Sequence, residues 1–132
     1  CSAERVTLAG SMMPASSMGK VASSAFHQED SGQHRIQVRA VALDDLLQRG
    51  EIHAPAVMKI DVEGAEMFVL RGARGLLSKH SPELFIEIHS KALGRECREF
   101  LRELRYEVRL LEPEEHEVCH FHAFNPVKHR AA

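Results

Sequence analysis

Aromatic residues are scarce in this sequence: among 132 residues there is no Trp, one Tyr and six Phe. Proteins that bind single-stranded nucleic acid stack the bases on aromatic side chains, and so few aromatic residues cannot build such a platform. An excess of positive charge is also missing, because 17 Lys and Arg against 19 Asp and Glu give a net charge of −2. The sequence therefore offers no basic surface for a phosphate backbone, and we expect no nucleic-acid partner.

Long hydrophobic runs are absent as well. No apolar run approaches the ~20 residues that a membrane-spanning helix needs, so we expect no membrane partner. The chain begins at Cys1 rather than Met, and no charged-then-apolar leader follows, so we expect no signal peptide. The cysteines Cys1, Cys97 and Cys119 are odd in number and widely spaced, which fits neither a disulfide framework nor a redox pair. We therefore expect a reducing, cytoplasmic location.

Composition divides the chain near residue 34, although its length allows only one domain. Residues 1–34 are rich in Ser, Ala and Met and hold only three branched aliphatic residues, too few to build a core. We predict a loop or hairpin there, with short strands near Arg5–Leu8 and Lys20–Phe26; an unstructured end is the alternative. Residues 35–132 are regularly patterned, and we interpret them as the carboxyl-terminal half of a larger domain.

Hydrophobic periodicity in residues 35–132 predicts an α/β fold. Two short apolar runs, Val57–Ile60 and Leu84–Ile88, are expected to be adjacent parallel strands, buried on both faces. One helix from about Glu66 to Leu77 crosses between them, and Asp44 caps a shorter helix that Gly50 ends. The remaining predicted elements are a strand over Arg35–Val41, an amphipathic helix through Cys97–Leu104, and an antiparallel hairpin of Tyr106–Leu111 and Cys119–Phe124. A parallel sheet that ends in such a hairpin is typical of half of a doubly wound fold.

Ionisable residues follow the two apolar strands, at the sheet edge where ligands of α/β proteins bind. Asp61 ends the first strand, and Glu87 and His89 lie at the end of the second. Glu87 and His89 share a face, and parallel neighbours are only ~4.8 Å apart, so we predict that all three side chains face one ligand. Mg²⁺ bound by the three is an alternative. We interpret Glu66 as stabilising a helix dipole and Glu63 as serving the same helix start.

A second cluster, Cys119-His120-Phe121-His122, places two imidazoles on one face of a strand. A zinc site would need further ligands, for which only uncertain candidates exist. We therefore interpret this segment as an edge strand with exposed histidines and predict no metal site there.

Residues Met58–Glu66, with the sequence MKIDVEGAE, and Val69–Ala73 behind them closely resemble the signature of the FkbM-type S-adenosylmethionine-dependent methyltransferases. The match is specific because the motif is long and is coupled to LDDLL upstream and EIH downstream. The resemblance covers about residues 35–126, and its further matching segments are Leu43–Leu47, Pro82–His89, Phe100–Leu101 and Tyr106–Val108.

The resemblance implies a Rossmann-like methyltransferase sheet, with S-adenosylmethionine as cofactor over the carboxyl ends of its strands. It implies that Asp61, Val62 and Glu63 lie beside the cofactor. It also implies that Glu87 and His89 lie on the acceptor side, so that Asp61, Glu87 and His89 are the catalytic residues. Such enzymes mostly methylate hydroxyl groups of small molecules, often sugars or secondary metabolites. A carboxylate or an imidazole can take the hydroxyl proton.

The sequence also departs from the family's pattern. No acid followed by a glycine-rich turn resembles the family's cofactor loop, and the acid expected to hold the ribose is missing. We therefore expect this chain alone to bind S-adenosylmethionine weakly or not at all, and to self-associate through the exposed edge of Val57–Ile60. Arg105 stands where the family usually has Gly, so a left-handed backbone there would be strained. The alternative functions are a non-catalytic remnant, kept as a binding or dimerisation module, and a metal-dependent α/β enzyme.

Overall fold

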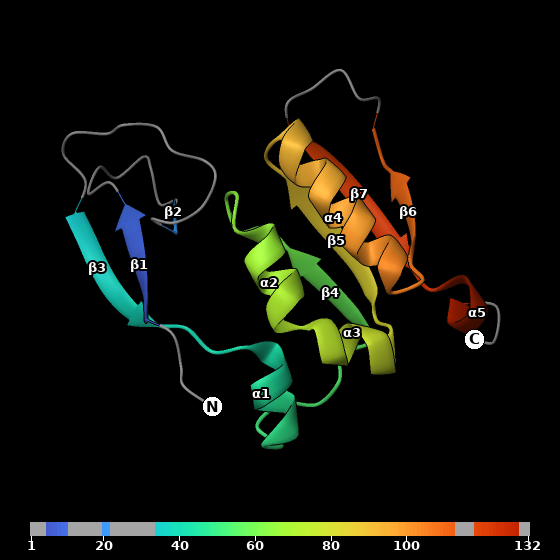
Figure 1. Ribbon diagram of the computed structural model, residues 1–132, viewed down its shortest axis with the longest axis horizontal. Helices are drawn as coiled ribbons and strands as arrows, with labels where there is room; N and C mark the ends of the chain where they lie inside the picture. Colours follow the sequence, from blue (N-terminus) through green and yellow to red (C-terminus); the bar gives the residue numbers. More distant parts are fainter. Residues whose placement is uncertain (1–4, 11–19, 22–33, 113–117, 130–132) are drawn as a thin grey trace.

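The computed structural model is a mixed α/β protein with two β-sheets, one of which is covered by helices (Figure 1). The structure describes residues 5–10, 20–21, 34–112 and 118–129. A three-stranded sheet has the strand order β2-β1-β3, and a four-stranded sheet has the order β4-β5-β7-β6. The four-stranded sheet carries the hydrophobic core and the predicted site residues, so it is described first.

Strands β4 (Val57–Ile60) and β5 (Glu83–Ile88) are parallel neighbours, which confirms the central prediction from the sequence. Their register pairs Val57 with Glu83 and Ile60 with Ile86. Because parallel strands run in the same direction, the chain leaves both of them at the same edge of the sheet. Strand β4 is the outermost strand at its side of this sheet; the self-association expected from that edge stays a prediction.

Burial on both faces was expected for these two strands, and that expectation is wrong. Val57 is 55% exposed and Phe85 is 39% exposed, whereas Ile60 and Ile86 are buried. Since side chains alternate along a strand, one face of β4 and β5 packs into the core and the other faces outward. The continuous apolar runs thus predicted the positions of the strands correctly, but they did not show whether one face or both faces of the strands are buried.

The hairpin of β6 (Glu107–Leu110) and β7 (Cys119–Phe124) is antiparallel, as predicted. Strand β7 also pairs antiparallel with β5, so β7 lies inside the sheet and β6 forms its edge. The interpretation of His120 and His122 as residues of an edge strand is therefore wrong. The strand that follows α4, β6, does not pair with β5 but lies one position further out in the sheet. Strand β7 then returns between β6 and β5. The middle of the predicted turn, residues 113–117, lies outside the described residues.

Three helices cover one face of this sheet: α2 (Glu66–Gly72), α3 (Arg74–His80) and α4 (Lys91–Glu103) (Figure 1). The single helix predicted from Glu66 to Leu77 is broken at Ala73, whose φ of −117° and ψ of 11° depart from helical values. Helix α4 confirms the predicted amphipathic helix. It begins after Ser90, whose Oγ accepts a hydrogen bond from the Leu93 N–H at 3.2 Å.

The core lies between these helices and the sheet. Its members that are no more than 1% exposed are Leu70, Ala73, Leu76, Leu77, Leu84, Ile86, Ile88, Cys97, Leu101, Phe121 and Ala123. Tyr106 is also buried, and its hydroxyl donates a hydrogen bond to the Pro82 carbonyl at 3.0 Å. Burial raises the pKa of Tyr106. This packing fixes β4 and β5 relative to α2, and the site described below lies where these elements meet.

The smaller sheet contains β1 (Arg5–Gly10), β2 (Lys20–Val21) and β3 (His34–Arg39), all paired antiparallel. Strands β1 and β2 fall where the sequence predicted short strands, although residues 22–26 of the second one lie outside the described residues. Strand β3 matches the strand predicted over Arg35–Val41, but it pairs with β1 along its whole length. The alternating order of predicted strands and helices implied that this strand joins the parallel sheet, and that implication is wrong, because the pattern of apolar residues shows that a segment is a strand and not which strand it pairs with.

Helix α1 (Leu43–Gln48) follows the smaller sheet, and α5 (Pro126–His129) closes the described chain. No side chain caps α1, because Asp44 lies within its first turn rather than before it. The prediction that Asp44 caps this helix is wrong. Gly50, with a φ of 70°, follows the helix end as predicted.

Arg105, which stands where the family usually has Gly, has a left-handed backbone with a φ of 64°. It follows the end of α4, where its N–H bonds to the Arg102 carbonyl at 2.9 Å and the Tyr106 N–H bonds to the Leu101 carbonyl at 3.0 Å. This pair of hydrogen bonds is a Schellman motif, which usually places Gly at the left-handed position.

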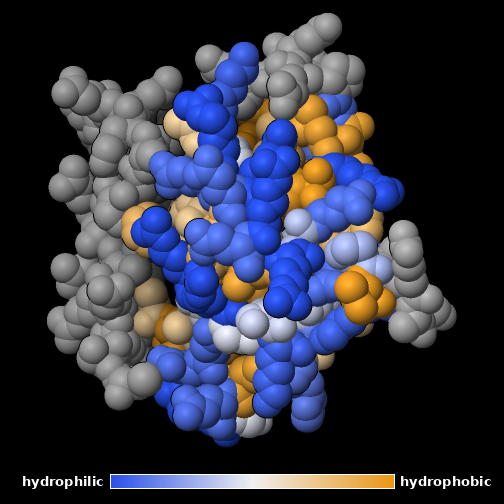
Figure 2. Space-filling view, turned by 45° about the vertical axis from the view of Figure 1, so that its right-hand side comes forward, coloured by the Kyte–Doolittle hydropathy of each residue, from blue (hydrophilic) through white to orange (hydrophobic). Residues whose placement is uncertain are grey.

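Hydrophilic side chains dominate the face of the molecule shown in Figure 2, where apolar patches are small and separate. Within the described part of the chain, no helix combines the length and the hydropathy needed to cross a membrane.

Candidate active site

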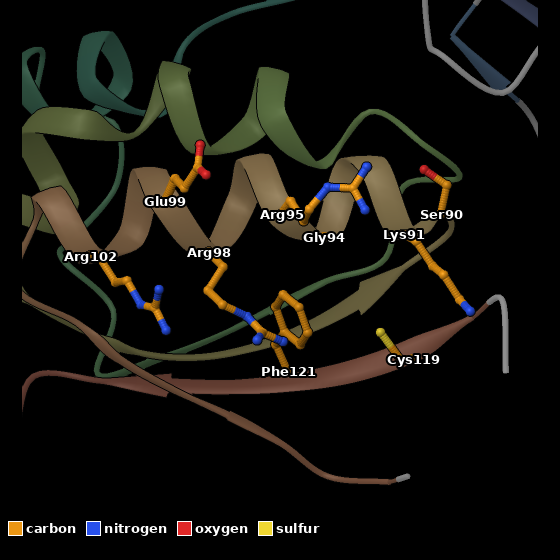
Figure 3. Close-up of a pocket in the computed structure, with 9 residues that line it drawn as sticks. All are labelled: Ser90, Lys91, Gly94, Arg95, Arg98, Glu99, Arg102, Cys119 and Phe121. Carbon is orange, nitrogen blue, oxygen red and sulfur yellow. The ribbon is translucent and has the colours of Figure 1, made fainter. Parts of the chain in front are cut away.

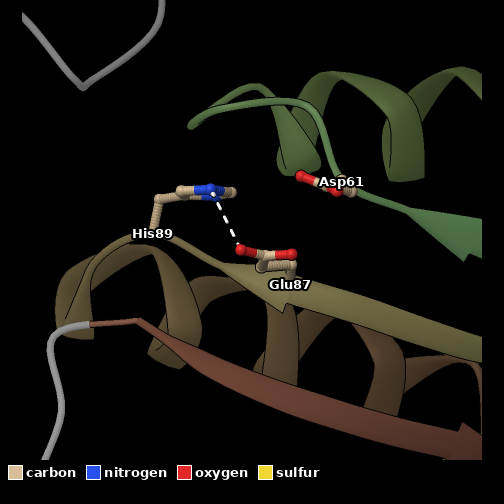
Figure 4. Close-up of side chains that lie close together, drawn as sticks. All are labelled: Asp61, Glu87 and His89. Carbon is tan, nitrogen blue, oxygen red and sulfur yellow. Dashed lines mark ion pairs between the residues drawn. The ribbon is translucent and has the colours of Figure 1, made fainter. Parts of the chain in front are cut away.

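Three predicted site residues converge at the carboxyl ends of β4 and β5 (Figure 4). Asp61 directly follows β4, Glu87 lies in β5, and His89 directly follows β5. Each offers a potential ligand atom, and these atoms all lie within 4.8 Å of one another. The structure thus brings together the side chains that the sequence placed at one sheet edge; their chemical roles stay a prediction.

His89 occupies the centre of this cluster and is only 6% exposed. Its Nδ1 lies 2.8 Å from Oε1 of Glu66. On the other side of the ring, its Nε2 lies 3.4 Å from Oε2 of Glu63 and 3.8 Å from Oε1 of Glu87. Three carboxylates therefore surround one buried imidazole, and the two nitrogens of the ring face different partners.

A tight turn after β4 carries Glu63 to this position. The Val62 carbonyl accepts a hydrogen bond from the Ala65 N–H at 3.1 Å, and the two central residues, Glu63 and Gly64, have φ values of 50° and 90°. A positive φ is natural for Gly but strained for Glu, and such strain concentrates at functional sites. Glu63 thus faces His89 rather than serving the helix start, and Val62 packs against the core.

Glu66 is the functional candidate that the interpretation from sequence missed. Its side chain is fully buried, and its Oε1 accepts a hydrogen bond from the Gly64 N–H at 3.1 Å besides contacting His89. A signal was available, because Glu66 precedes Leu70 by four residues and Ala73 by seven and therefore lies on the apolar stripe of the predicted helix. A carboxylate on that stripe needs a partner in the interior.

Asp61 is the most accessible member of the cluster, and it forms an ion pair with the exposed Lys59. Its Oδ2 lies 2.9 Å from Nζ of Lys59, and the side chain of Asp61 is 35% exposed. The hydrogen bond from Lys59 lowers the pKa of the Asp61 carboxyl, and the same bond raises the pKa of Lys59. Asp61 is therefore ionised at neutral pH, with one oxygen held by the lysine.

Glu87 links the cluster to strand β7. Its Oε2 lies 3.5 Å from Nε2 of His120, the residue opposite it in the register of β5 and β7. The Nδ1 of His120 lies 2.9 Å from Oε2 of Glu112, and this hydrogen bond raises the pKa of His120. His120 was expected on an edge strand with exposed histidines, and only the pairing of β7 with β5 places it beside Glu87.

Residues 6–108 match the family model described as Methyltransferase FkbM domain, which confirms the resemblance seen in the sequence motifs. The chain belongs to this family. The match spans the smaller sheet and strands β4 and β5 of the larger sheet, and it includes the turn after β4 and the end of β5, where the cluster lies.

One curated relative is hexuronic acid methyltransferase AglP of Haloferax volcanii. This FkbM-family chain is 28% identical to it over 81 residues, which are 57% of the chain and 34% of the relative. The chain thus spans about a third of the length of that relative. A comparison with solved structures finds no significant match.

The FkbM family implies a methyl donor, normally S-adenosylmethionine. The negative charge of the cluster is complementary to the positive charge of that donor. Asp61, Glu63 and Glu87 place three carboxylates at the strand ends, and negative charge there would attract a positively charged group such as a sulfonium. The same geometry could hold a divalent cation between Asp61, Glu87 and His89, although Lys59 already neutralises part of the charge of Asp61.

A groove of about 370 Å³ lies between α4 and β7, apart from the cluster (Figure 3). Arg98 extends from α4 toward Phe121, with its guanidinium carbon 5.0 Å from the centre of the Phe121 ring. The groove includes none of the three convergent residues, so it is not the predicted site.

Proposed function

We propose that the natural protein containing this chain transfers a methyl group from S-adenosylmethionine to a hydroxyl group of a sugar or a similar small molecule. The observation that carries the proposal is the convergence of Asp61, Glu87 and His89 at the ends of two parallel strands, within the segment that matches the FkbM domain. The parallel pair followed by an antiparallel hairpin supports a Rossmann-like methyltransferase sheet. The relative named for hexuronic acid supports a sugar acceptor.

When bound, S-adenosylmethionine supplies an electrophilic methyl group on a positively charged sulfur. His89 accepts the proton of the acceptor hydroxyl at Nε2, the ring nitrogen on the side of Glu63 and Glu87. Glu87 lies beside that nitrogen and stabilises the positive charge that the ring then carries. Asp61 and Glu63 border the same space and attract the cationic donor. Alignment of the acceptor oxygen by these groups supplies much of the remaining acceleration.

The test is substitution in the natural protein, with a glucuronic acid glycoside as the acceptor probe and methyl transfer as the readout. We expect His89→Gln and Glu87→Gln each to lower turnover by about 10²–10⁴, the range for loss of a positioned acid or base. Asp61→Asn should weaken donor binding. Glu83→Gln is the matched control, because Glu83 lies on β5 at the end away from the cluster.

Normal turnover in all three site variants would show that the chemistry lies elsewhere and would overturn the assignment. A natural protein that neither binds S-adenosylmethionine nor methylates a hydroxyl probe would favour the non-catalytic alternative. The spacing of the three ligand atoms supports a second candidate, metal-assisted methyl transfer. Turnover that is lost on chelation and restored by Mg²⁺ or Mn²⁺ would favour that candidate.

A further inference from the structure

Glu66 is a buried carboxylate whose position the start of a helix does not explain. An acid that only stabilises the helix dipole from the first turn can do so from the surface, where water still reaches its oxygens. Glu66 is fully buried instead, and its Oε2 has no hydrogen-bond partner among the described residues. Removing a carboxylate from water is costly, so a specific interaction inside the protein must hold it there.

That interaction is with His89. Oε1 of Glu66 lies 2.8 Å from Nδ1 of His89, and the Gly64 N–H donates to the same oxygen at 3.1 Å. The backbone of the turn after β4 therefore fixes the oxygen that meets the imidazole. A carboxylate held in this way accepts the Nδ1–H of a neutral ring, and the partner of one ring nitrogen decides which nitrogen carries the proton.

We infer that Glu66 is the positioning residue of His89: it places the ring proton on Nδ1 and leaves Nε2 as the proton acceptor on the side of Glu63 and Glu87. The inference rests on the proposed function for its consequence, since Nε2 is the atom that takes the hydroxyl proton there. Without Glu66 the described residues place no carboxylate at Nδ1, so the ring can turn or exchange its two tautomers. Glu66 touches neither acceptor nor donor in this role, and it acts through His89 alone.

The first experiment reads the tautomer directly, without any enzymatic assay. Nitrogen-15 correlation spectra of the imidazole rings in the natural protein distinguish protonated from unprotonated ring nitrogens. We expect His89 to be in the Nδ1–H form in the unaltered chain and in Glu66→Gln, whose amide oxygen still accepts. We expect a mixture of tautomers in Glu66→Met, which fills the same space without an acceptor. An Nε2–H form in the unaltered chain, or an unchanged tautomer in a folded Glu66→Met variant, would overturn the inference.

The second experiment connects the tautomer to turnover in the natural protein, with the glucuronic acid glycoside as acceptor probe. We expect Glu66→Met to lower kcat by about 10- to 100-fold at nearly constant KM, a loss of the size found when the carboxylate behind a metal-bound histidine is removed. Glu66→Gln should recover most of that loss, because it restores the acceptor. An equal fall in kcat in Glu66→Met and Glu66→Gln would contradict positioning through Nδ1.

The two experiments separate failure of this inference from failure of the proposed function. If the natural protein methylates no hydroxyl probe, the proposed function fails, whereas the spectra still decide whether Glu66 sets the tautomer of His89. If the protein is active and the Glu66→Met spectrum is unchanged, the positioning role fails and the proposed function stands.

Discussion

The carboxylate of Asp44 caps helix α3, not the helix to which Asp44 belongs. Its two oxygens accept hydrogen bonds from the backbone N–H groups of Gly75 and Leu76, each at 2.7 Å. These N–H groups belong to the first turn of α3 and have no partner within that helix. The two bonds tie α1 to α3 across 31 and 32 residues of sequence.

Removal of this carboxylate should destabilise the protein. We expect Asp44→Ala to lower the free energy of unfolding by about 0.5–2 kcal/mol, the usual cost of losing an N-cap. Asp45→Ala, a change of the same charge at the next residue, is the control and should cost less. Urea denaturation followed by circular dichroism measures both values. Equal effects of the two substitutions would show that general charge, not the cap, matters.

Gly75 should resist the stabilisation that Ala normally brings to a helix. A Cβ at Gly75 would lie 3.1 Å from Oδ2 of Asp44, whereas a Cβ at Gly72 would meet only Ala42, at 3.5 Å. We therefore expect Gly72→Ala to stabilise the protein by up to about 1 kcal/mol. Gly75→Ala should gain less or destabilise. In an Asp44→Ala background the two glycines should respond alike, and a persistent difference there would refute the contact as its cause.

Replacement of Arg105 by Gly should stabilise the protein, because Gly adopts a left-handed backbone without strain. Arg105→Gly is expected to stabilise the protein by about 1 kcal/mol, because the φ of 64° is costly for a side-chain-bearing residue and free of strain for Gly. Gly50→Ala, at a φ of 70°, provides the reverse control and should destabilise. Thermal unfolding curves measure both changes. A lower midpoint temperature for Arg105→Gly would mean that the arginine side chain contributes more than its backbone strain costs.

His120 should make stability depend on pH. Its pKa in the folded protein is raised above 6.5 by the hydrogen bond with Glu112, so the folded state favours the protonated ring. The contribution is fully present below pH 6.5 and is lost as the pH rises through the folded pKa. The side chain is 40% exposed, and we expect less than about 1 kcal/mol after solvent screening.

Denaturation at about pH 6 and about pH 8 measures this contribution, since the two values lie on either side of an ordinary histidine transition. Glu112→Gln should reduce the difference in unfolding free energy between the two. His53→Gln is the control, because His53 is an exposed histidine for which the described part of the chain offers no ion pair. An unchanged pH slope in Glu112→Gln would show that other groups set it.

The sequence alone determined the α/β class and the main elements of the larger sheet. The apolar runs at β4 and β5 and the amphipathic stripe of α4 appear directly in the order of residues, because hydrophobic periods of two and 3.6 report local geometry. The convergence of Asp61 with Glu87 and His89 followed from the same reasoning, since the ends of parallel neighbours meet at one sheet edge. The motif around Asp61 was sufficient to identify the family.

Only the tertiary structure decided the contacts between distant segments. The pairing of β7 with β5 placed His120 beside Glu87, and the pairing of β3 with β1 removed that strand from the parallel sheet. The burial of Glu66 against His89 and the hydrogen bonds from α3 to Asp44 are also contacts between distant segments that only the tertiary structure shows. Periodicity specifies which face of an element is buried but not which element it meets. The sequence could therefore place Glu66 on an apolar stripe, but it could not identify His89, 23 residues away, as its partner, nor Gly75, 31 residues away, as the partner of Asp44.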